Sequence, residues 1–283
     1  MTYGLPMTLR AGLIQTRTPA TRAGALAHVA PLVREAAAQG ATFIATPEGT
    51  NILQRDKSLL LPQLTLLADD PVVQGLQALA AELSVTILIG SALVLREDGK
   101  AANRAALIAP DGQISATYDK LHMFDVDLPT GESARESETY EPGDRAVTAL
   151  AGEAKLGLTI CYDVRFPALY RALATAGAEV IVTPAAFTRP TGEAHWEILL
   201  RARAIETGSF VLAPAQGGFH EDGRGTYGRT LAVGPWGELL GKLDHDEPGV
   251  LVVDLDLAAV AKARAAIPAL PNARAFAAPI SLS

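Results

Sequence analysis

The chain has 283 residues, of which 49% are hydrophobic, and its 24 basic and 31 acidic residues give a formal net charge of −7. This composition is typical of a folded globular protein and excludes a disordered chain. The acidic balance, without a Lys/Arg cluster, argues against nucleic acid or an anionic membrane as a partner, and no apolar run reaches the roughly 20 residues of a membrane helix.

The first 15 residues lack the features of a secretory signal. We expect residues 1–6 to form a mobile extension, or translation to begin at Met7. Cys161 is the only cysteine, so an intrachain disulfide is impossible, and the sequence favours a reducing cytoplasm. A lone cysteine is usually an inert core residue, so the neighbours of Cys161 must decide its role.

Short runs of apolar and β-branched residues alternate along the chain with helical stripes. The runs predict buried strands at 9–15, 42–46, 85–95, 105–109, 156–160, 179–183, 210–215, 229–233 and 250–254. The stripes predict helices over 25–36, before a helix-ending Gly40, and over 71–83 and 194–207. Apolar strands alternating with helices indicate an α/β architecture in which helices cover the sheets.

Two stretches break the alternation. Strands at 85–95, 105–109 and 113–118 follow one another without helices, and the turn at 110–112 makes the last two antiparallel. A second hairpin is expected at 234–237. The sheets are therefore mixed, which disfavours a TIM barrel. We expect one domain over residues 1–283, with a functional loop at 125–144.

Three polar residues each follow a different predicted strand. Cys161 stands at a strand-to-helix turn, where free N–H groups would lower the thiol pKa and bind an oxyanion. Glu48 follows the strand at 42–46, and Lys120 follows the strand at 113–118. Taken alone, Glu48 is as readily an acidic residue of a surface loop, and an isolated lysine after a strand is usually a solvated charge.

Together these residues suit attack of a thiol on an amide. That reaction needs a base for the thiol proton, a cation or N–H donors for the oxyanion, and an acid for the leaving group. Glu48 can be base and acid, Lys120 the cation, and the Tyr162 N–H a second donor. We expect one sheet edge to present all three side chains.

Three segments resemble the catalytic signatures of the nitrilase superfamily, in the same order along the chain: Pro47-Glu48, 119–125 (DKLHMFD) and 159–167 (TICYDVRFP). The resemblance covers nearly the whole chain. It implies an α-β-β-α sandwich, a catalytic triad of Glu48, Lys120 and Cys161, neither a metal nor an organic cofactor, and a homodimer or higher oligomer.

Further segments resemble the Nit branch of that superfamily: 186–197, 201–206, 227–229 and 235–238. Arg229 departs from the histidine that is usual there. The resemblance implies one of two activities, hydrolysis of deaminated glutathione (the α-keto analogue of glutathione) or ω-amidase activity on α-ketoglutaramate. Residues 201–206 and 213–216 favour the first. Alternatives within the superfamily are a nitrile hydrolase and an N-carbamoyl amidohydrolase.

The Nit branch also carries an active-site glutamate in a Glu-Ser motif, which Glu136-Ser137 matches; Glu138 and Glu132 are competing candidates. The substrate is expected to be a small amide with a carboxylate. Arg165 is the candidate for binding it, because a guanidinium offers a bidentate fork, although an ion pair with Asp163 competes. By the resemblance, Phe187 and Thr191 line the pocket beside Tyr162.

Two other kinds of function are weighed against the amidase. A Cys-His hydrolase would need His122 as the partner of Cys161. A non-catalytic scaffold would leave Cys161 buried and inert. The remaining histidines show no metal-ligand spacing with one another or with Cys161.

Overall fold

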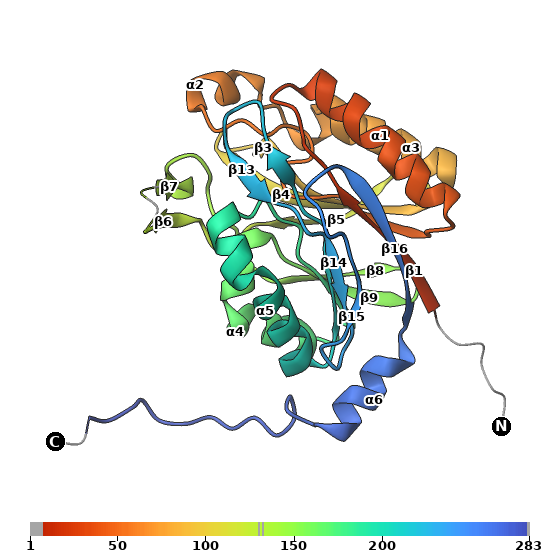
Figure 1. The fold of residues 1–283 in the computed structure, drawn as a ribbon, viewed down its shortest axis with the longest axis vertical. Coiled ribbons are helices and arrows are strands. Elements are labelled where there is room, and N and C mark those ends of the chain that lie inside the picture. The colour runs from red at the N-terminus through yellow and green to blue at the C-terminus, as the bar shows by residue number, and fades with distance from the viewer. Residues whose placement is uncertain (1–7, 130, 132, 282–283) are drawn as a thin grey trace.

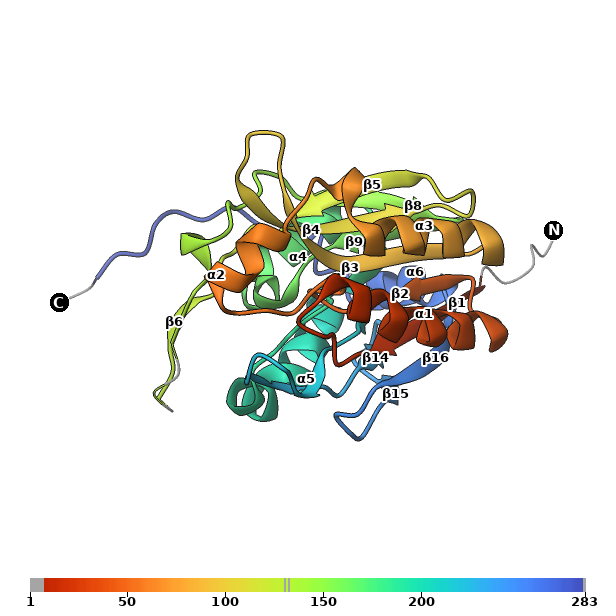
Figure 2. The same cartoon turned by 90° about the horizontal axis from the view of Figure 1, so that it is seen from above.

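The computed structural model describes residues 8–129, 131 and 133–281, so the extension expected at 1–6 lies outside the described residues. Two six-stranded sheets stack face to face, and helices cover both outer faces (Figures 1 and 2). This is the mixed-sheet α-β-β-α sandwich expected from the sequence. No helix within the described ranges is both long and apolar enough to cross a membrane.

The first sheet has its parallel strands in the middle and antiparallel strands at its edges. Strands β1, β2 and β3 are parallel, whereas β16, β4 and β5 each run antiparallel to their neighbours. The spatial order is β16 (Gly249–Asp256), β1 (Thr8–Gln15), β2 (Phe43–Ala45), β3 (Thr86–Leu95), β4 (Ala101–Ile108) and β5 (Ile114–Asp119).

The second sheet repeats this plan. Strands β9, β10 and β11 are parallel, and the flanking strands are antiparallel. The spatial order is β15 (Leu239–Lys242), β14 (Leu231–Val233), β11 (Phe210–Ala213), β10 (Val180–Val182), β9 (Ala154–Leu158) and β8 (Val147–Ala151).

The alternation of side chains along each strand divides the apolar residues between two layers. In β2, Phe43 and Ala45 belong to the core between the sheets, and Ile44 belongs to the layer beneath α1 (Arg22–Ala38) and α3 (Pro71–Leu83). Helices α4 (Pro167–Thr175) and α5 (Arg189–Thr207) cover the second sheet (Figure 1). Burial on both faces explains the continuous apolar runs.

The two expected hairpins are confirmed. Gly112 adopts a φ of +83° between β4 and β5, and Gly237 a φ of +86° between β14 and β15. Helix α5 begins five residues earlier than expected, because Pro190 fits the first turn of a helix, where no N–H is needed. Helix α6 (Ala258–Ala266) was not expected from the sequence.

The segment 125–144 is not the loop that the sequence indicated. It contains a short hairpin, β6 (Asp125–Asp127) with β7 (Ser133–Arg135), and a single 3-10 turn, η3 (Glu136–Glu138). These strands are short and charged, so they carry no apolar alternation by which a strand is recognised. Glu132 lies outside the described residues.

Candidate active site

The three residues expected at the site meet between the sheets. Glu48 follows β2 and Lys120 follows β5, both in the first sheet, whereas Cys161 follows β9 of the second. The expectation of a single sheet edge is therefore wrong. Stacking of the two sheets brings the strand ends together, and chain order alone does not reveal which strand belongs to which sheet.

Cys161 opens the 3-10 turn η4 (Cys161–Arg165) with a φ of +49°. A non-glycine residue in the left-handed region costs about 1–2 kcal/mol and is held only by its surroundings. The Cys161 N–H donates to Pro184 O at 2.8 Å, which fixes the turn against β10. The expected strand-to-helix turn at Cys161 is thus present.

Glu48 is buried and is surrounded by hydrogen-bond donors. Its carboxylate accepts from Lys120 Nζ at 3.0 Å, Asn103 Nδ2 at 2.9 Å and the Ala186 N–H at 2.8 Å. Burial alone would raise its pKa, but the charge of Lys120 and hydrogen bonds from Cys161, Lys120 and Asn103 hold the pKa below the ordinary 4.5. Glu48 is therefore an ionised acceptor beside the thiol.

The thiol itself is not a low-pKa thiolate. Burial raises the pKa of Cys161 well above the ordinary 9.0, and the negative charge of Glu48 adds to this, while Lys120 opposes it. The expectation that N–H groups at the turn lower the thiol pKa is wrong for this resting site. Proton transfer to Glu48 must therefore accompany attack.

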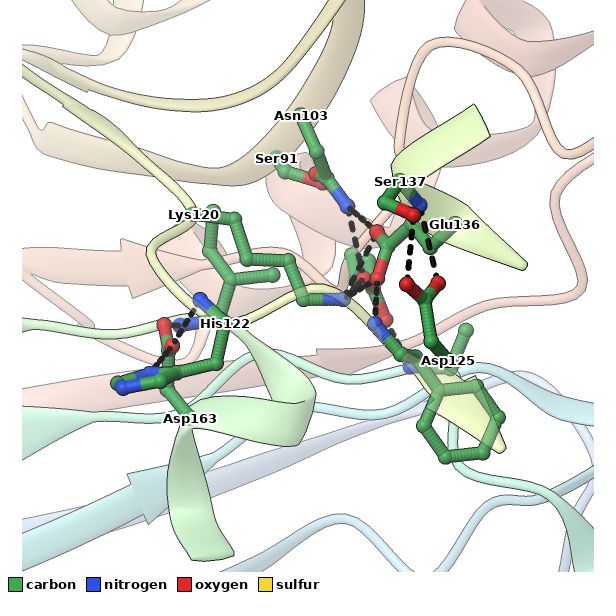
Figure 3. A network of polar contacts seen from close by, with 12 residues as sticks. Ser91, Asn103, Lys120, His122, Asp125, Glu136, Ser137 and Asp163 are labelled. Atoms are coloured by element: carbon green, nitrogen blue, oxygen red, sulfur yellow. Dashed lines mark hydrogen bonds and ion pairs between the residues drawn. The ribbon is translucent and has the colours of Figure 1, made fainter. Parts of the chain in front are cut away.

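Lys120 lies between the carboxylates of Glu48 and Glu136, and Figure 3 shows its ammonium directed at Glu136. Its Nζ contacts Glu136 Oε1 at 2.9 Å and Oε2 at 2.8 Å, besides Glu48. Burial would lower the pKa of Lys120, but the charges of Glu136 and Glu48 raise it well above 10.5. The ammonium is therefore permanently charged and fixed in position, as electrostatic stabilisation of an oxyanion requires.

Glu136 is the second carboxylate that the Glu-Ser motif suggested. The Phe124 N–H donates to its Oε2 at 2.7 Å and Asn103 Nδ2 to its Oε1 at 3.1 Å. Its competitor Glu138 instead pairs with Lys57 at 2.6 Å. Ser137 holds the turn by donating to Asp125. In this geometry Glu136 contacts the lysine rather than the thiol.

Asn103 was missed by sequence reasoning. Its Nδ2 donates to both Glu48 and Glu136, so it joins the two carboxylates that contact Lys120; Figure 3 shows Asn103 beside Glu136 and Lys120. The sequence signal was only an asparagine just before the strand expected at 105–109, whereas β4 begins at Ala101 and buries Asn103. That signal is ambiguous, because a strand residue can point to either face.

Asp163 joins the turn at Cys161 to the segment that carries Lys120. Its buried carboxylate accepts from Tyr118 Oη at 2.7 Å and from the Ile160 N–H at 2.8 Å. His122 Nδ1 lies 2.6 Å from the same carboxylate, and its ring stacks on Phe166. The Cys-His alternative is therefore wrong: His122 is bound to Asp163, and Glu48 is the group beside Cys161.

A cavity of about 630 Å³ opens over the site. Tyr162, Phe187 and Thr191 line it, as expected, together with Cys161 and Lys120. Among the described residues, no group of three or more His, Cys, Asp or Glu side chains is arranged to hold a metal ion.

Arg165 is not among the residues that line the cavity. Its guanidinium packs over the Phe187 ring, 5.3 Å from the centroid, and lies 3.3 Å from His195 Nδ1. The η4 turn directs Arg165 toward α5, behind the wall, and the competing ion pair with Asp163 is also not formed. The cations on the cavity wall besides Lys120 are Arg55, Lys57, Arg135 and Arg224.

A model of the carbon–nitrogen hydrolase family matches residues 10–265. The chain is 40% identical over 245 residues to the deaminated glutathione amidase of a Synechocystis species, covering 85% of this chain and 89% of that protein. It is 35% identical over 268 residues to the omega-amidase of Mus musculus, with 95% and 96% covered.

Solved structures show the same sandwich. The NitFhit protein of C. elegans superposes with a TM-score of 0.87 at 28% identity over 94% of this chain, which spans 65% of that longer protein. An amidase from Nesterenkonia sp. AN1 superposes with a TM-score of 0.78 at 27% identity, with 94% of each chain covered. In that structure the active-site cysteine carries the acetamide moiety of fluoroacetamide.

Proposed function

Since the chain belongs to the carbon–nitrogen hydrolase family, we propose that it is an amidase acting through a Cys161 thioester and that its substrate is deaminated glutathione. One observation carries the mechanism: an ionised Glu48 contacts both the Cys161 thiol and the Lys120 ammonium at the base of a cavity. The relatives named for this activity favour the substrate.

In the first half-reaction Glu48 takes the thiol proton as sulfur attacks the amide carbonyl carbon. The carbonyl oxygen becomes an oxyanion, which the Lys120 ammonium and the Tyr162 N–H stabilise. Glu48 then gives its proton to the leaving nitrogen, the carbon–nitrogen bond breaks, and a thioester remains. In this scheme Glu136 positions Lys120.

In the second half-reaction a water molecule replaces the departed amine. Glu48 takes a proton from the water as its oxygen attacks the thioester carbonyl, and the oxyanion again lies against Lys120. Collapse expels the Cys161 sulfur, which recovers its proton from Glu48. For deaminated glutathione the products are the five-carbon α-keto diacid and cysteinylglycine.

The second candidate is ω-amidase activity on α-ketoglutaramate, which the omega-amidase relatives support. The two substrates share the acyl group and differ in the leaving amine, a dipeptide or ammonia. The 630 Å³ cavity is large for α-ketoglutaramate, which has about half the non-hydrogen atoms of deaminated glutathione. Steady-state kinetics on both substrates tests the choice: a kcat/KM that favours α-ketoglutaramate would overturn it.

Replacement of the nucleophile tests the mechanism. Cys161→Ala removes the sulfur, so amine release should stop while the circular dichroism spectrum and unfolding midpoint stay near those of the parent. Undiminished turnover in that variant would exclude a Cys161 thioester. Mass spectrometry of the parent chain with slowly hydrolysed substrate should detect an acyl adduct on Cys161.

We further infer a homodimer that works in a reducing compartment such as the cytoplasm. The reaction needs Cys161 as a free thiol, and it is free and buried in the structure. Three exposed apolar side chains, Ile205, Trp236 and Ile267, surround one groove between α5 and the C-terminal segment. Such a face on a globular chain is typical of a subunit interface.

A further inference from the structure

Of the four basic side chains on the outer wall of the cavity, three form salt bridges with acidic side chains. Lys57 pairs with Glu138 at 2.6 Å, and Arg135 pairs with Asp127 at 2.8 Å. Arg224 pairs with Asp222 through its Nε at 2.6 Å. Arg55 has no acidic side chain within salt-bridge distance among the described residues. One guanidinium on the wall therefore lacks a counter-charge.

Arg55 and Arg224 are held together by Asp222. The Asp222 carboxylate, whose side chain is 1% exposed, accepts from Arg224 Nε and from the Arg55 backbone N–H at 3.0 Å. A single buried carboxylate thus fixes two guanidinium-bearing segments, 51–56 and the hairpin of β12 (Gly217–Phe219) with β13 (Gly225–Tyr227).

Arg55 and Arg224 carry two positive charges against the one negative charge of Asp222. Asp56 also lines the cavity, but its carboxylate accepts from the Ser58 N–H at 2.9 Å and the Ser58 hydroxyl at 2.7 Å and pairs with neither arginine. The Arg55 guanidinium therefore remains available to bind an anion.

The position of Arg55 indicates which part of a substrate it meets. Glu48, Lys120 and Cys161 are buried at the base of the cavity, whereas Arg55 is exposed at its rim. The amine product must leave and water must enter while the acyl group is still bound to Cys161. The amine portion of the substrate therefore occupies the outer part of the cavity, on the side of Arg55.

We propose that Arg55, whose backbone N–H is held by Asp222, binds the carboxylate at the end of the amine portion of the substrate. The inference rests on the proposed function and deepens it: the preferred substrates are amides whose amine portion is a short peptide with a free C-terminal carboxylate. This carboxylate is distinct from the one on the acyl portion, for which Arg165 was the candidate; Arg165 packs over Phe187 and does not line the cavity.

A double-mutant cycle between enzyme and substrate tests this subsite. The four measurements pair the parent chain or Arg55→Met with deaminated glutathione or with its C-terminal carboxamide. Removing the carboxylate should lower kcat/KM of the parent about 30-fold, mainly through KM, because a charge-assisted hydrogen bond is lost. On deaminated glutathione, kcat/KM of Arg55→Met should also lie about 30-fold below that of the parent. This variant should then have the same kcat/KM for deaminated glutathione and for its C-terminal carboxamide.

Three controls sharpen the result. With α-ketoglutaramate, which has no carboxylate on its amine side, Arg55→Met should stay within about twofold of the parent. Arg55→Lys should recover part of the loss because it keeps the charge. Arg145→Met removes an exposed arginine paired with Asp144, outside the cavity, and should leave every rate unchanged.

The outcomes show separately whether the Arg55 subsite is wrong and whether the proposed substrate is wrong. If the parent prefers deaminated glutathione but does not distinguish it from its carboxamide, the subsite is overturned and the function stands. The subsite is also overturned if Arg55→Met lowers kcat/KM equally for deaminated glutathione and for α-ketoglutaramate. If the parent prefers α-ketoglutaramate, the proposed function is overturned, and the subsite falls with it.

Discussion

At the scale of single residues, the resting site holds an ionised Glu48 beside a neutral thiol and a charged Lys120. The pKa of Glu48 lies below 4.5, that of Cys161 well above 9.0 and that of Lys120 well above 10.5. All three groups keep their charge state across neutral pH. The proposed mechanism therefore relies on Glu48 as a general base rather than on a preformed thiolate.

This arrangement predicts the pH profile of kcat/KM. The base is competent only when Glu48 is ionised, so activity should fall as the pH drops below about 4.5 and should stay level up to about pH 9. Stopped assays between pH 4 and 10, corrected for unfolding at the extremes, measure the curve. A rising limb centred near pH 7 would instead indicate a thiolate-dependent enzyme.

The contacts of Glu136 predict a role in positioning Lys120. In Glu136→Gln the bidentate carboxylate contact with Lys120 is lost, and we expect kcat to fall about 100-fold with little change in KM. The matched control is Glu138→Gln, whose side chain pairs with Lys57 away from the triad. Equal effects of the two substitutions would contradict the assignment.

At the scale of elements, the hairpin β12–β13 depends on a histidine that must stay neutral. His220 follows β12, is 5% exposed, and its Nε2 lies 2.6 Å from Thr226 Oγ1. Burial, assisted by the charge of Arg224, lowers the pKa of His220 to about 4. The unfolded chain would protonate this side chain near its ordinary 6.5, so the two states bind protons differently.

The consequence for stability has a definite sign. Between pH 6.5 and about 4 the unfolded state binds the extra proton, so the free energy of unfolding falls as the pH falls, by about 3 kcal/mol from this group. Urea unfolding at pH 7, 5.5 and 4.5 measures this effect. The free energy of unfolding should fall less between pH 7 and 4.5 in His220→Gln than in the parent. The exposed His245→Gln is the control and should follow the parent curve.

At the scale of the whole molecule, the groove between α5 and the C-terminal segment predicts how copies associate. Ile205, Trp236 and Ile267 are 56%, 60% and 57% exposed, and burying them in a dimer would remove this apolar surface from water. Trp236→Glu should therefore shift the mass measured by light scattering toward the monomer. Leu59→Glu changes an equally exposed apolar residue on α2 (Lys57–Leu60), at the opposite end of the molecule (Figure 1), and should leave the mass unchanged.

The sequence by itself determined the layered α/β fold and three of the polar residues that gather at the candidate site. Strands that are buried on both faces appear in the sequence as continuous apolar runs, and turns contain Gly and Pro. The mixed sheets and both hairpins were therefore predictable. Glu48, Lys120 and Cys161 were predictable because each stands at a strand end within a distinctive motif. Short charged strands such as β6 and β7 leave no such pattern.

Only the tertiary structure decided which groups touch. Cys161 meets Glu48 across two sheets, and a thiol that the local turn would acidify is instead kept neutral by burial beside a carboxylate. Asn103 joins the site through the pairing of strands within the first sheet, and Arg55 is held beside it through Asp222, over separations that no local pattern records. Contacts between distant segments set the charges, because electrostatic energies depend on distance and burial rather than on chain order.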